Sequence, residues 1–273
     1  MAPFDARLVN TAHGPMWVFA GDTFVSRSLE LYGEYSAAET DIFQQIVRPG
    51  ATVVEVGANL GSHTIMLARA CSPGLLYAFE PQQRVFQLLC ANVVQNQLTN
   101  VRLFPEAVGE SEGWARIPIL DYAAAGNFGG VAVTSLPGNE GERTADATRV
   151  ITLDALNLGR CDVLKIDVEG WEVQVLRGGR DLIRRSRPVI YLENDRASHQ
   201  GELIAMLDAA GYASYWHIAP LFRPDNFNRR TDDIFPGVAG LNMLCVPGDR
   251  PISVGGLEKI DPANWRSPLK PLP

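Results

Sequence analysis

A buried strand that runs directly into a glycine-rich turn constrains the fold of this chain more than any other feature. Residues 52–57 read Thr-Val-Val-Glu-Val-Gly, and residues 63–68 read His-Thr-Ile-Met-Leu-Ala with helical spacing. The glycines therefore fall where a strand turns into a helix, which is where open α/β sheets bind nucleotides. Gly57 and Gly61 let backbone approach a ligand closely, and Asn59 tolerates a positive φ. The pattern favours a nucleotide-type ligand, and the alternative is a tight turn without one.

Strands and helices alternate from residue 52 onward, which is typical of βαβ units with a mainly parallel sheet. In the first half, we expect strands and helices in turn at residues 52–56, 62–70, 75–79, 83–96 and 101–104. In the second half, we expect a strand, a helix, a strand and a helix at residues 163–167, 171–176, 188–193 and 201–210, and then a C-terminal antiparallel strand pair at 212–217 and 241–246. The sequence thus predicts an α/β fold with a Rossmann-like, doubly wound sheet.

We divide the chain into an N-terminal extension (1–34), one domain (35–247) and a proline-rich C-terminal tail (248–273). Two segments of the domain lack the βα rhythm. The first is a β-hairpin-like insertion at 109–150, with short strands at 114–119 and 130–134, and the second is a candidate lid at 218–240. Irregular connections of this length in a compact domain are usually functional or disordered.

Composition and charge exclude several classes of protein. The formal net charge of -7 argues against a nucleic-acid partner, because affinity for phosphate backbones comes from clustered Lys and Arg. No apolar run reaches the roughly 18 residues of a membrane span, and the start of the chain lacks the pattern of a secretion signal. The cysteines are far apart and without CxxC spacing, which indicates buried, reduced thiols rather than zinc ligands or a redox pair: Cys71, Cys90, Cys161 and Cys245. We therefore expect a soluble, cytoplasmic protein, and the sequence leaves a homodimer open.

Two carboxylates indicate which nucleotide the turn binds. Glu80 ends the second strand, about 20 residues past the turn, where a carboxylate can accept both hydroxyls of a ribose. The dinucleotide fingerprint is broken, because Asn59 replaces its second glycine and Ser62 stands near its third. Glu55, two residues before Gly57, would repel phosphate and attract a cation. S-adenosylmethionine carries a sulfonium and an ammonium and no phosphate, so it suits this turn better than NAD does.

Several ordered motifs resemble the FkbM-type methyltransferase family. They are VVEVGANLGSHT at 53–64, AFEP at 78–81, EAVG at 106–109, KIDVEGWE at 165–172, VLRGG at 175–179 and YLEN at 191–194. The similarity spans residues 35–247. It implies a class I methyltransferase fold, S-adenosylmethionine as the methyl donor, and O-methylation of hydroxyls on sugars, glycans or small natural products. Two positions depart from the family: Glu55 stands where many members have Asp, and His63 where an aromatic residue is common.

The resemblance also implies which residues bind the cofactor. The turn and Glu80 would line the methionine and the ribose, and Glu106 with Ala107 would border the adenine. The full set of cofactor-binding candidates is Glu55, Gly57, Ala58, Asn59, Gly61, Ser62, His63, Thr64, Glu80, Pro81, Glu106 and Ala107.

Acidic residues follow the two strands that neighbour the turn in such a sheet. Asp167 and Glu169 follow one strand and Glu193 ends the next, so we expect the three to converge on one mouth. A hydroxyl acceptor must lose a proton, and Asp167 is the first choice for a general base or an acid that orients the substrate, followed by Glu169 and Glu193. Mutual repulsion should raise at least one pKa of this cluster. Alternatively, the three acids hold Mg²⁺ or Ca²⁺.

Three further roles are expected near the site. His63 is the fourth catalytic candidate, because it lies at the turn and could contact the methionine end or the acceptor; its alternative role is packing. Ser62 or Thr64 should cap the helix after the turn, and Glu169 should cap the helix after the acidic loop.

Two other functions remain open at this level. An NAD(P)-dependent oxidoreductase shares the fold and the acid at residue 80, and a non-catalytic binding protein could keep the fold without turnover. The expected partner is a small-molecule or glycan acceptor, whose identity the sequence does not reveal.

Overall fold

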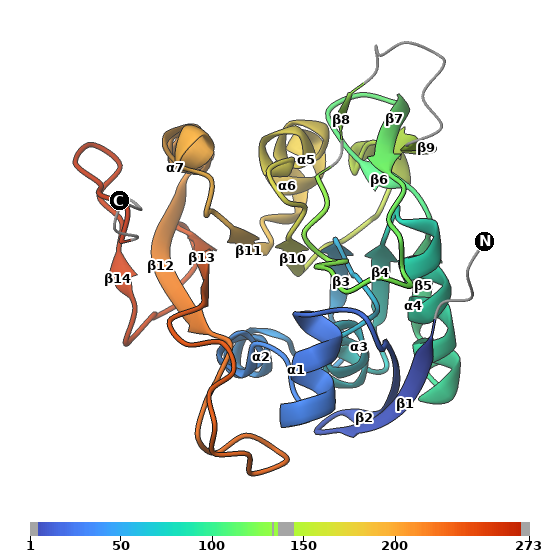
Figure 1. Ribbon diagram of the computed structural model, residues 1–273. Coiled ribbons are helices and arrows are strands. Elements are labelled where there is room, and N and C mark those ends of the chain that lie inside the picture. The colour runs from blue at the N-terminus through green and yellow to red at the C-terminus, as the bar shows by residue number, and fades with distance from the viewer. Residues whose placement is uncertain (1–4, 133, 136–144, 269–273) are drawn as a thin grey trace.

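An eight-stranded sheet forms the centre of the molecule in the computed structural model, which describes residues 5–132, 134–135 and 145–268 (Figure 1). The strand order is β14-β12-β13-β11-β10-β3-β4-β5. In chain order, these strands are β3 Thr52–Val56, β4 Leu75–Phe79, β5 Val101–Phe104, β10 Val163–Ile166, β11 Val189–Glu193, β12 Tyr212–Pro220, β13 Ala239–Pro247 and β14 Glu258–Lys259. Strands β11 to β5 pair in parallel, and β13 pairs antiparallel with both β11 and β12. The doubly wound sheet and its closing antiparallel pair are confirmed.

The register brings the carboxyl ends of the central strands level with one another. Val56 of β3 lies opposite Ile166 of β10 and Phe79 of β4, and Ile166 lies opposite Leu192 of β11. The chain winds from β3 to β5 in one direction and from β10 to β11 in the other, so β3 and β10 flank the switch point. Ligands of open α/β sheets bind at this place, beyond the carboxyl ends of the strands.

Helices cover both faces of the sheet (Figure 1). The helices α1 Val25–Tyr32, α2 Ala37–Ile46 and α3 Thr64–Cys71 lie on one side, the helices α5 Glu172–Gly178, α6 Arg180–Ser186 and α7 Ala197–Ala209 lie on the other, and α4 Gln83–Gln95 lies near β5. Phe43 and Leu67 on the first side and Leu182 and Leu203 on the second are almost completely buried. Parallel strands covered in this way are apolar on both faces, which explains the unbroken hydrophobic runs in the sequence.

The helix expected at 201–210 begins earlier, at Ala197, and Gly201 lies inside it. Glycine is unfavourable in a helix interior. In the fold, a side chain at residue 201 would meet the ring of Trp265 at 3.2 Å, so the position is closely packed. Helix α6 was not predicted at all.

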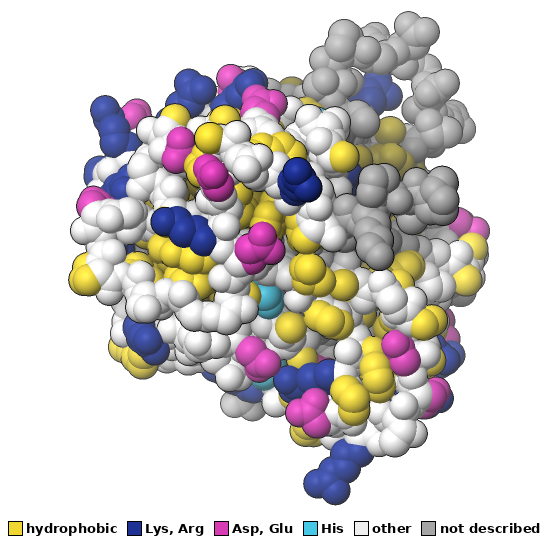
Figure 2. All heavy atoms as spheres, turned by 90° about the vertical axis from the view of Figure 1, so that its left-hand side faces the viewer, with side chains coloured by type: hydrophobic (Ala, Val, Ile, Leu, Met, Phe, Trp, Pro, Cys, Tyr) yellow, Lys and Arg dark blue, Asp and Glu magenta, His cyan; other side chains and the backbone are white. Residues whose placement is uncertain are grey.

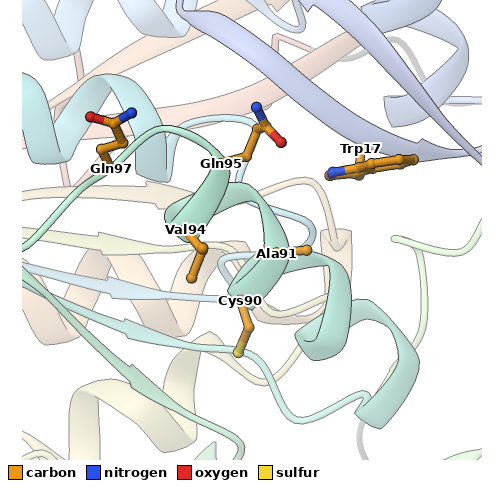
Figure 3. A pocket seen from close by; sticks show the side chains of 6 residues that line it. All are labelled: Trp17, Cys90, Ala91, Val94, Gln95 and Gln97. Carbon is orange, nitrogen blue, oxygen red and sulfur yellow. The ribbon is translucent and has the colours of Figure 1, made fainter.

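Residues 5–34, expected as an extension, pack into the core. A hairpin of β1 Ala6–Thr11 and β2 Gly14–Phe19 precedes α1, and Met16, Val18 and Phe19 are at most 2% exposed. The side chain of Asn92 on α4 fastens the hairpin, because it accepts from the amide of Trp17 and donates to the carbonyl of Trp17. Figure 3 shows the shallow surface groove between Trp17 and the exposed side of α4.

The insertion forms a small second sheet rather than a simple hairpin. Its strands are β6 Ala107–Val108, β7 Gly113–Pro118, β8 Thr134–Ser135 and β9 Ala145–Ile151, in the order β6-β9-β7-β8. The main partner of β7 is β9, which the sequence reasoning did not predict, while only two residues of β8 pair with β7. Exposed Ala147 and Arg149 alternate with buried Thr148 and Val150 in β9, which is the period of a half-buried strand. Residues 133 and 136–144 of the insertion lie outside the described residues.

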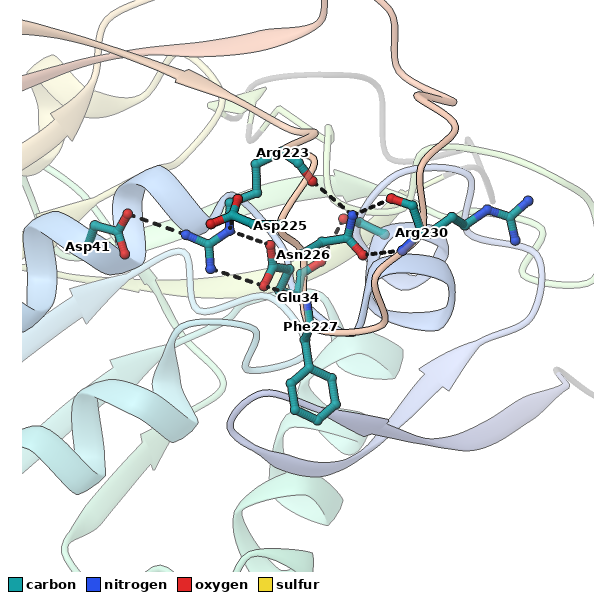
Figure 4. Close-up of polar contacts among 8 residues, drawn as sticks. Glu34, Asp41, Arg223, Asp225, Asn226, Phe227 and Arg230 are labelled. Atoms are coloured by element: carbon teal, nitrogen blue, oxygen red, sulfur yellow. Dashed lines mark hydrogen bonds and ion pairs between the residues drawn. The ribbon is translucent and has the colours of Figure 1, made fainter.

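The segment 221–238, between β12 and β13, contains no helix or strand, whereas residues 218–220 and 239–240 of the expected irregular range belong to these two strands. It lies against the N-terminal helices (Figure 4). Arg223 donates two hydrogen bonds to Glu34, at 2.8 and 3.2 Å, and also pairs with Asp41. Phe235 stacks on Phe24 with ring centroids 5.7 Å apart.

The cysteines, the length of the helices and the surface charge can be compared with the expectations from composition. All four cysteines are free, and no helix in the described ranges is long and apolar enough to cross a membrane. On the face that carries β12 to β14, acidic and basic side chains are interspersed (Figure 2).

Candidate functional site

A cavity of about 90 Å³ lies beyond the carboxyl ends of β3, β4 and β10. Most of the residues around it come from the glycine turn, the ends of β4 and β10, the start of α1 and the insertion. Its walls are formed by Phe24, Val25, Tyr35, Gly57, Asn59, Ser62, His63, Glu80, Asn127, Gly129, Gly130, Lys165, Asp167 and Glu169. The structure thus brings five of the expected cofactor residues together with two of the expected catalytic acids.

The glycine turn requires a residue without a side chain where β3 ends. Gly57 has a φ of 83°, and a Cβ atom there would lie 1.7 Å from the carbonyl oxygen of Asp167. The amides of Gly57 and Ala58 both donate to the carbonyl of Phe79. Asn59 also has a positive φ, of 51°. The turn therefore lies between β4 and β10 in a conformation that only glycine and asparagine adopt readily.

Glu80 is fixed beside this turn. Its side chain is 4% exposed and accepts from the amides of Asn59 at 2.9 Å and Gln82 at 2.8 Å. Burial raises the pKa of Glu80 to about 7, although these two hydrogen bonds act in the opposite direction. A carboxylate held in this orientation at the cavity wall can accept the hydroxyls of a ribose.

Glu55 lies under the turn and not in the cavity wall. It is completely buried, accepts from the hydroxyl of Thr64 at 2.7 Å, and lies 3.9 Å from Nζ of Lys165. Burial raises the pKa of Glu55 to about 7, whereas Lys165 and Thr64 lower it. The cation expected beside Glu55 is therefore supplied by the chain itself.

The expected cap of the helix after the turn was wrong. Helix α3 has no side-chain cap, because the hydroxyl of Thr64 donates to Glu55 instead and Ser62 lines the cavity.

Lys165 is a site residue that the sequence reasoning missed. It is 2% exposed, donates to Oδ2 of Asp167 at 3.2 Å, and also donates to the carbonyl of Gly57. Burial alone would lower the pKa of Lys165, but Asp167 and Glu55 offset this and hold it above its ordinary value. A lysine inside the otherwise apolar strand β10 was the available signal, because buried parallel strands rarely carry a charge.

The three acids of the predicted mouth lie together. Asp167, Glu169 and Glu193 each have an oxygen within 4.8 Å of those of the other two. Burial, and next the charge of Asp167, raises the pKa of Glu169 to about 7, while Arg196 at 2.6 Å lowers it. Burial and the other two acids hold the pKa of Glu193 well above its usual range. The expected repulsion within the cluster is therefore present.

The expected cap of the helix after this loop was wrong, because α5 has no side-chain cap and its first residue, Glu172, instead holds the loop before it. Oε1 of Glu172 accepts from the amides of Val168 and Gly170, at 3.2 and 3.1 Å. Glu169 has a positive φ of 55° and pairs with Arg196, so it does not cap α5. Glu169 lies instead at the wall of the cavity.

His63 is both packed and part of the wall. It is 3% exposed between the rings of Tyr35 and Phe43, and its Nε2 atom has no hydrogen-bond partner in the described part of the chain. Burial, and next Lys165, holds the pKa of His63 well below its usual range, so the imidazole is neutral. Tyr35 and Phe24 complete this wall, and no sequence pattern pointed to either of them.

The insertion closes the cavity. Gln82 donates to the carbonyl of Phe128 at 3.0 Å, and the neighbouring Gly129 lies so close to Asn59 that a Cβ atom there would be 2.5 Å from its amide nitrogen. The cavity is therefore smaller than the roughly 300–1,000 Å³ of most small-molecule sites.

A second cavity, of about 660 Å³, lies on the other side of Gln82, between α4 and the insertion sheet. Gln82, Pro81 and Pro105 line it. Glu106 and Ala107, expected at the adenine, line neither of these two cavities.

The chain is similar to known methyltransferases in sequence. A family model described as the methyltransferase FkbM domain matches residues 55–214, a range that contains the turn, Glu80 and the three acids. The 31-O-demethyl-FK506 methyltransferase FkbM of Streptomyces tacrolimicus is 29% identical over 204 residues, which cover 64% of this chain and 78% of that protein.

Solved structures of low sequence identity are similar as well. A methyltransferase FkbM from Methylobacillus flagellatus matches with a TM-score of 0.48 and 15% identity, over 75% of this chain and 50% of that chain. A SAM-dependent O-methyltransferase from Thermotoga maritima matches with a TM-score of 0.47 and 12% identity, over 90% and 79% of the two chains.

Proposed function

The chain belongs to the FkbM methyltransferase family and is an S-adenosylmethionine-dependent methyltransferase, and we propose that its acceptor is a hydroxyl group on a sugar, a glycan or a small natural product. The observation that carries the proposal is the single cavity that joins the glycine turn and Glu80 to Asp167 and Glu169. A donor held along the turn would have its methyl group close to carboxylates that can orient a hydroxyl and take up its proton.

The residues at the turn suit this donor. Gly57 lines the cavity without a side chain, and Glu80 presents a fixed carboxylate for the ribose. The surrounding acids favour a ligand with a sulfonium and an ammonium over one with phosphates. Lys165 does not reverse this preference, because Asp167 and Glu55 compensate its charge.

S-adenosylmethionine supplies the methyl group: the acceptor oxygen forms the new C–O bond as the C–S bond breaks, and the electron pair of that bond stays on sulfur. The residues of the chain position the acceptor and remove its proton. Asp167 is held by Lys165 at one oxygen, so it can accept a hydrogen bond from the hydroxyl in a fixed geometry. Glu169, with its pKa raised to about 7, can hold the released proton near neutral pH.

The acidic mouth favours a hydroxyl as the acceptor group. Carboxylates accept hydrogen bonds from hydroxyls, whereas they repel a carboxylate acceptor. The relative from Streptomyces tacrolimicus is named for methylation at an oxygen of a natural product, and we extend this acceptor class to the present chain.

The test is methyl transfer from tritiated S-adenosylmethionine to a panel of hydroxylated sugars, glycans and natural products. Mass spectrometry and NMR of the product would identify the methylated atom. Asp167→Asn should lower kcat by about 100-fold or more, the usual effect of losing a positioned acid or base. Asp181→Asn, which changes an exposed acid on α6, should leave kcat unchanged.

Two results would contradict the proposal. Label found on nitrogen or carbon in every productive acceptor would exclude O-methylation. Full activity in Asp167→Asn, with an unchanged unfolding midpoint, would remove Asp167 from the mechanism.

A further inference from the structure

Three carboxylates at the mouth of the cavity are close enough to share one ion. The nearest oxygens of Asp167, Glu169 and Glu193 all lie within 4.8 Å of one another. Ligand oxygens stand about 2.1 Å from Mg²⁺ and about 2.4 Å from Ca²⁺, so two oxygens on one ion are separated by at most about twice these distances. The cluster is therefore within the span of one Ca²⁺ coordination sphere, and Mg²⁺ requires its oxygens to lie within about 4.2 Å of one another.

Glu193 provides a second, independent observation. Its Oε2 atom is completely buried and has no hydrogen-bond partner among the described residues. Leaving a buried acceptor without a partner costs about 1–3 kcal/mol, and more when the group is charged. Such orphaned oxygens are rare in native proteins, and a bound ion is one of the few features that account for them.

The cations of the chain do not compensate Glu193 directly. Lys165 pairs with Asp167 and Glu55, and Arg196 pairs with Glu169 and Asp195. In the described part of the chain, no Lys, Arg or His nitrogen lies within 4 Å of the Glu193 carboxylate. The two neighbouring cations are thus paired with other acids of the site, and the Glu193 carboxylate has no ion pair of its own.

We propose that Asp167, Glu169 and Glu193 bind one divalent cation, Ca²⁺ or Mg²⁺, at the edge of the methyl-transfer cavity. Asp167 and Glu169 line this cavity, so the ion would face the acceptor. With one oxygen from each acid, up to three of the six positions on Mg²⁺ remain for water or for acceptor oxygens.

The open positions define a substrate class. An acceptor with two neighbouring oxygens, such as a vicinal diol or a hydroxyl beside a carbonyl, can occupy two of them at once. The ion then lowers the pKa of the reacting hydroxyl, and a carboxylate that binds through one oxygen keeps its second oxygen to receive the proton. This catalytic role rests on the proposed O-methylation, whereas the binding of the ion does not.

Binding is tested with Mn²⁺ as the probe, by electron paramagnetic resonance of the free ion during titration of the full chain. The wild type should bind one Mn²⁺ per chain, and Mg²⁺ should displace it. Glu193→Gln and Glu169→Gln, which keep the size of the side chain, should each weaken binding at least tenfold. Asp181→Asn should bind as the wild type does, and unfolding midpoints confirm that every variant is folded.

The outcomes separate the site from the reaction. Absence of saturable binding, or equal affinity in the wild type and both glutamine variants, would overturn the site. Methyl transfer that continues at the same rate after chelation with EDTA would overturn the catalytic role of the ion and leave the methyltransferase intact. Mn²⁺ bound at these acids without transfer to any hydroxyl would support the site and contradict the proposed O-methylation.

Discussion

Gly57→Ala tests the need for a residue without a side chain at the cofactor turn, and Gly50→Ala is its matched control. The two glycines have φ values of 83° and 82°, so alanine suffers the same left-handed strain at both, about 1–2 kcal/mol. Their surroundings differ. A Cβ atom at Gly50 would meet nothing within 4 Å, whereas at Gly57 it would lie 1.7 Å from the carbonyl oxygen of Asp167.

The magnitude follows from this collision. Non-bonded heavy atoms pack at about 3.5–4.0 Å, so the turn and the end of β10 would have to separate by nearly 2 Å. The amide of Asp167 donates to the carbonyl of Val56 at 3.0 Å, and this separation would break that hydrogen bond. We expect Gly50→Ala to lose about 1–2 kcal/mol of unfolding free energy and Gly57→Ala to lose about 4 kcal/mol or more.

Urea unfolding and calorimetric titration with S-adenosylhomocysteine measure the two consequences. Gly50→Ala should bind the ligand as the wild type does, and Gly57→Ala should bind it about 100-fold more weakly, because a displacement of 1 Å is already enough for such a loss. Equal stability losses in the two variants, with unchanged affinity in both, would refute the reasoning.

The remaining predictions concern buried charges. Burial raises the pKa of Glu39 from 4.5 to about 7, so the ionisation of Glu39 lowers the free energy of unfolding as the pH rises from 4.5 through 7. Glu39→Gln should therefore be as stable as the wild type at pH 4 and up to about 3 kcal/mol more stable at pH 8. Urea unfolding at both pH values checks this, and a variant that is less stable than the wild type at pH 8 would contradict it. Glu80→Gln leaves one acceptor oxygen for the two amides that the carboxylate binds, and it has no charge to offer a ribose. Calorimetry should therefore show an affinity for S-adenosylhomocysteine reduced by about 10- to 100-fold. An unchanged affinity would place the ribose elsewhere. Arg223→Ala leaves the buried Glu34 without its ion pair and with only the amide of Phe227 as a donor among the described residues, and should cost about 1–2 kcal/mol. Arg230→Ala breaks an exposed pair and should cost less than about 1 kcal/mol. Equal thermal unfolding midpoints of the two variants would show that the 221–238 segment is not held by Arg223.

Local patterns were sufficient to predict the sheet and the cofactor turn. The run Val53–Val56 followed by glycine predicts this strand and turn, because a strand buried on both faces is mainly apolar, here with Glu55 as the exception, and its turn needs a positive φ. The convergence of Asp167, Glu169 and Glu193 also followed from local information, since each comes at or just after the carboxyl end of a strand in one parallel sheet.

Long-range contacts explain what the sequence reasoning missed. Tyr35 and Phe24 reach the cavity only because the N-terminal helices pack beside the turn, and no short motif encodes this. Glu55 has the spacing of a ligand carboxylate, yet Lys165 from another strand neutralises it within the core. Strand β9 pairs with β7, which is distant from it in the sequence, so the alternation of buried and exposed residues within β9 was the local evidence for it.

Direct measurement of ligand binding tests the central claim, that the cavity at Gly57 and Glu80 holds S-adenosylmethionine. Calorimetric titration of the purified chain with S-adenosylmethionine and, separately, with NADH compares the two nucleotides that a fold of this kind could bind. We expect one S-adenosylmethionine site per chain, weakened in Glu80→Gln, and no saturable binding of NADH. Saturable binding of NADH without binding of S-adenosylmethionine would contradict it.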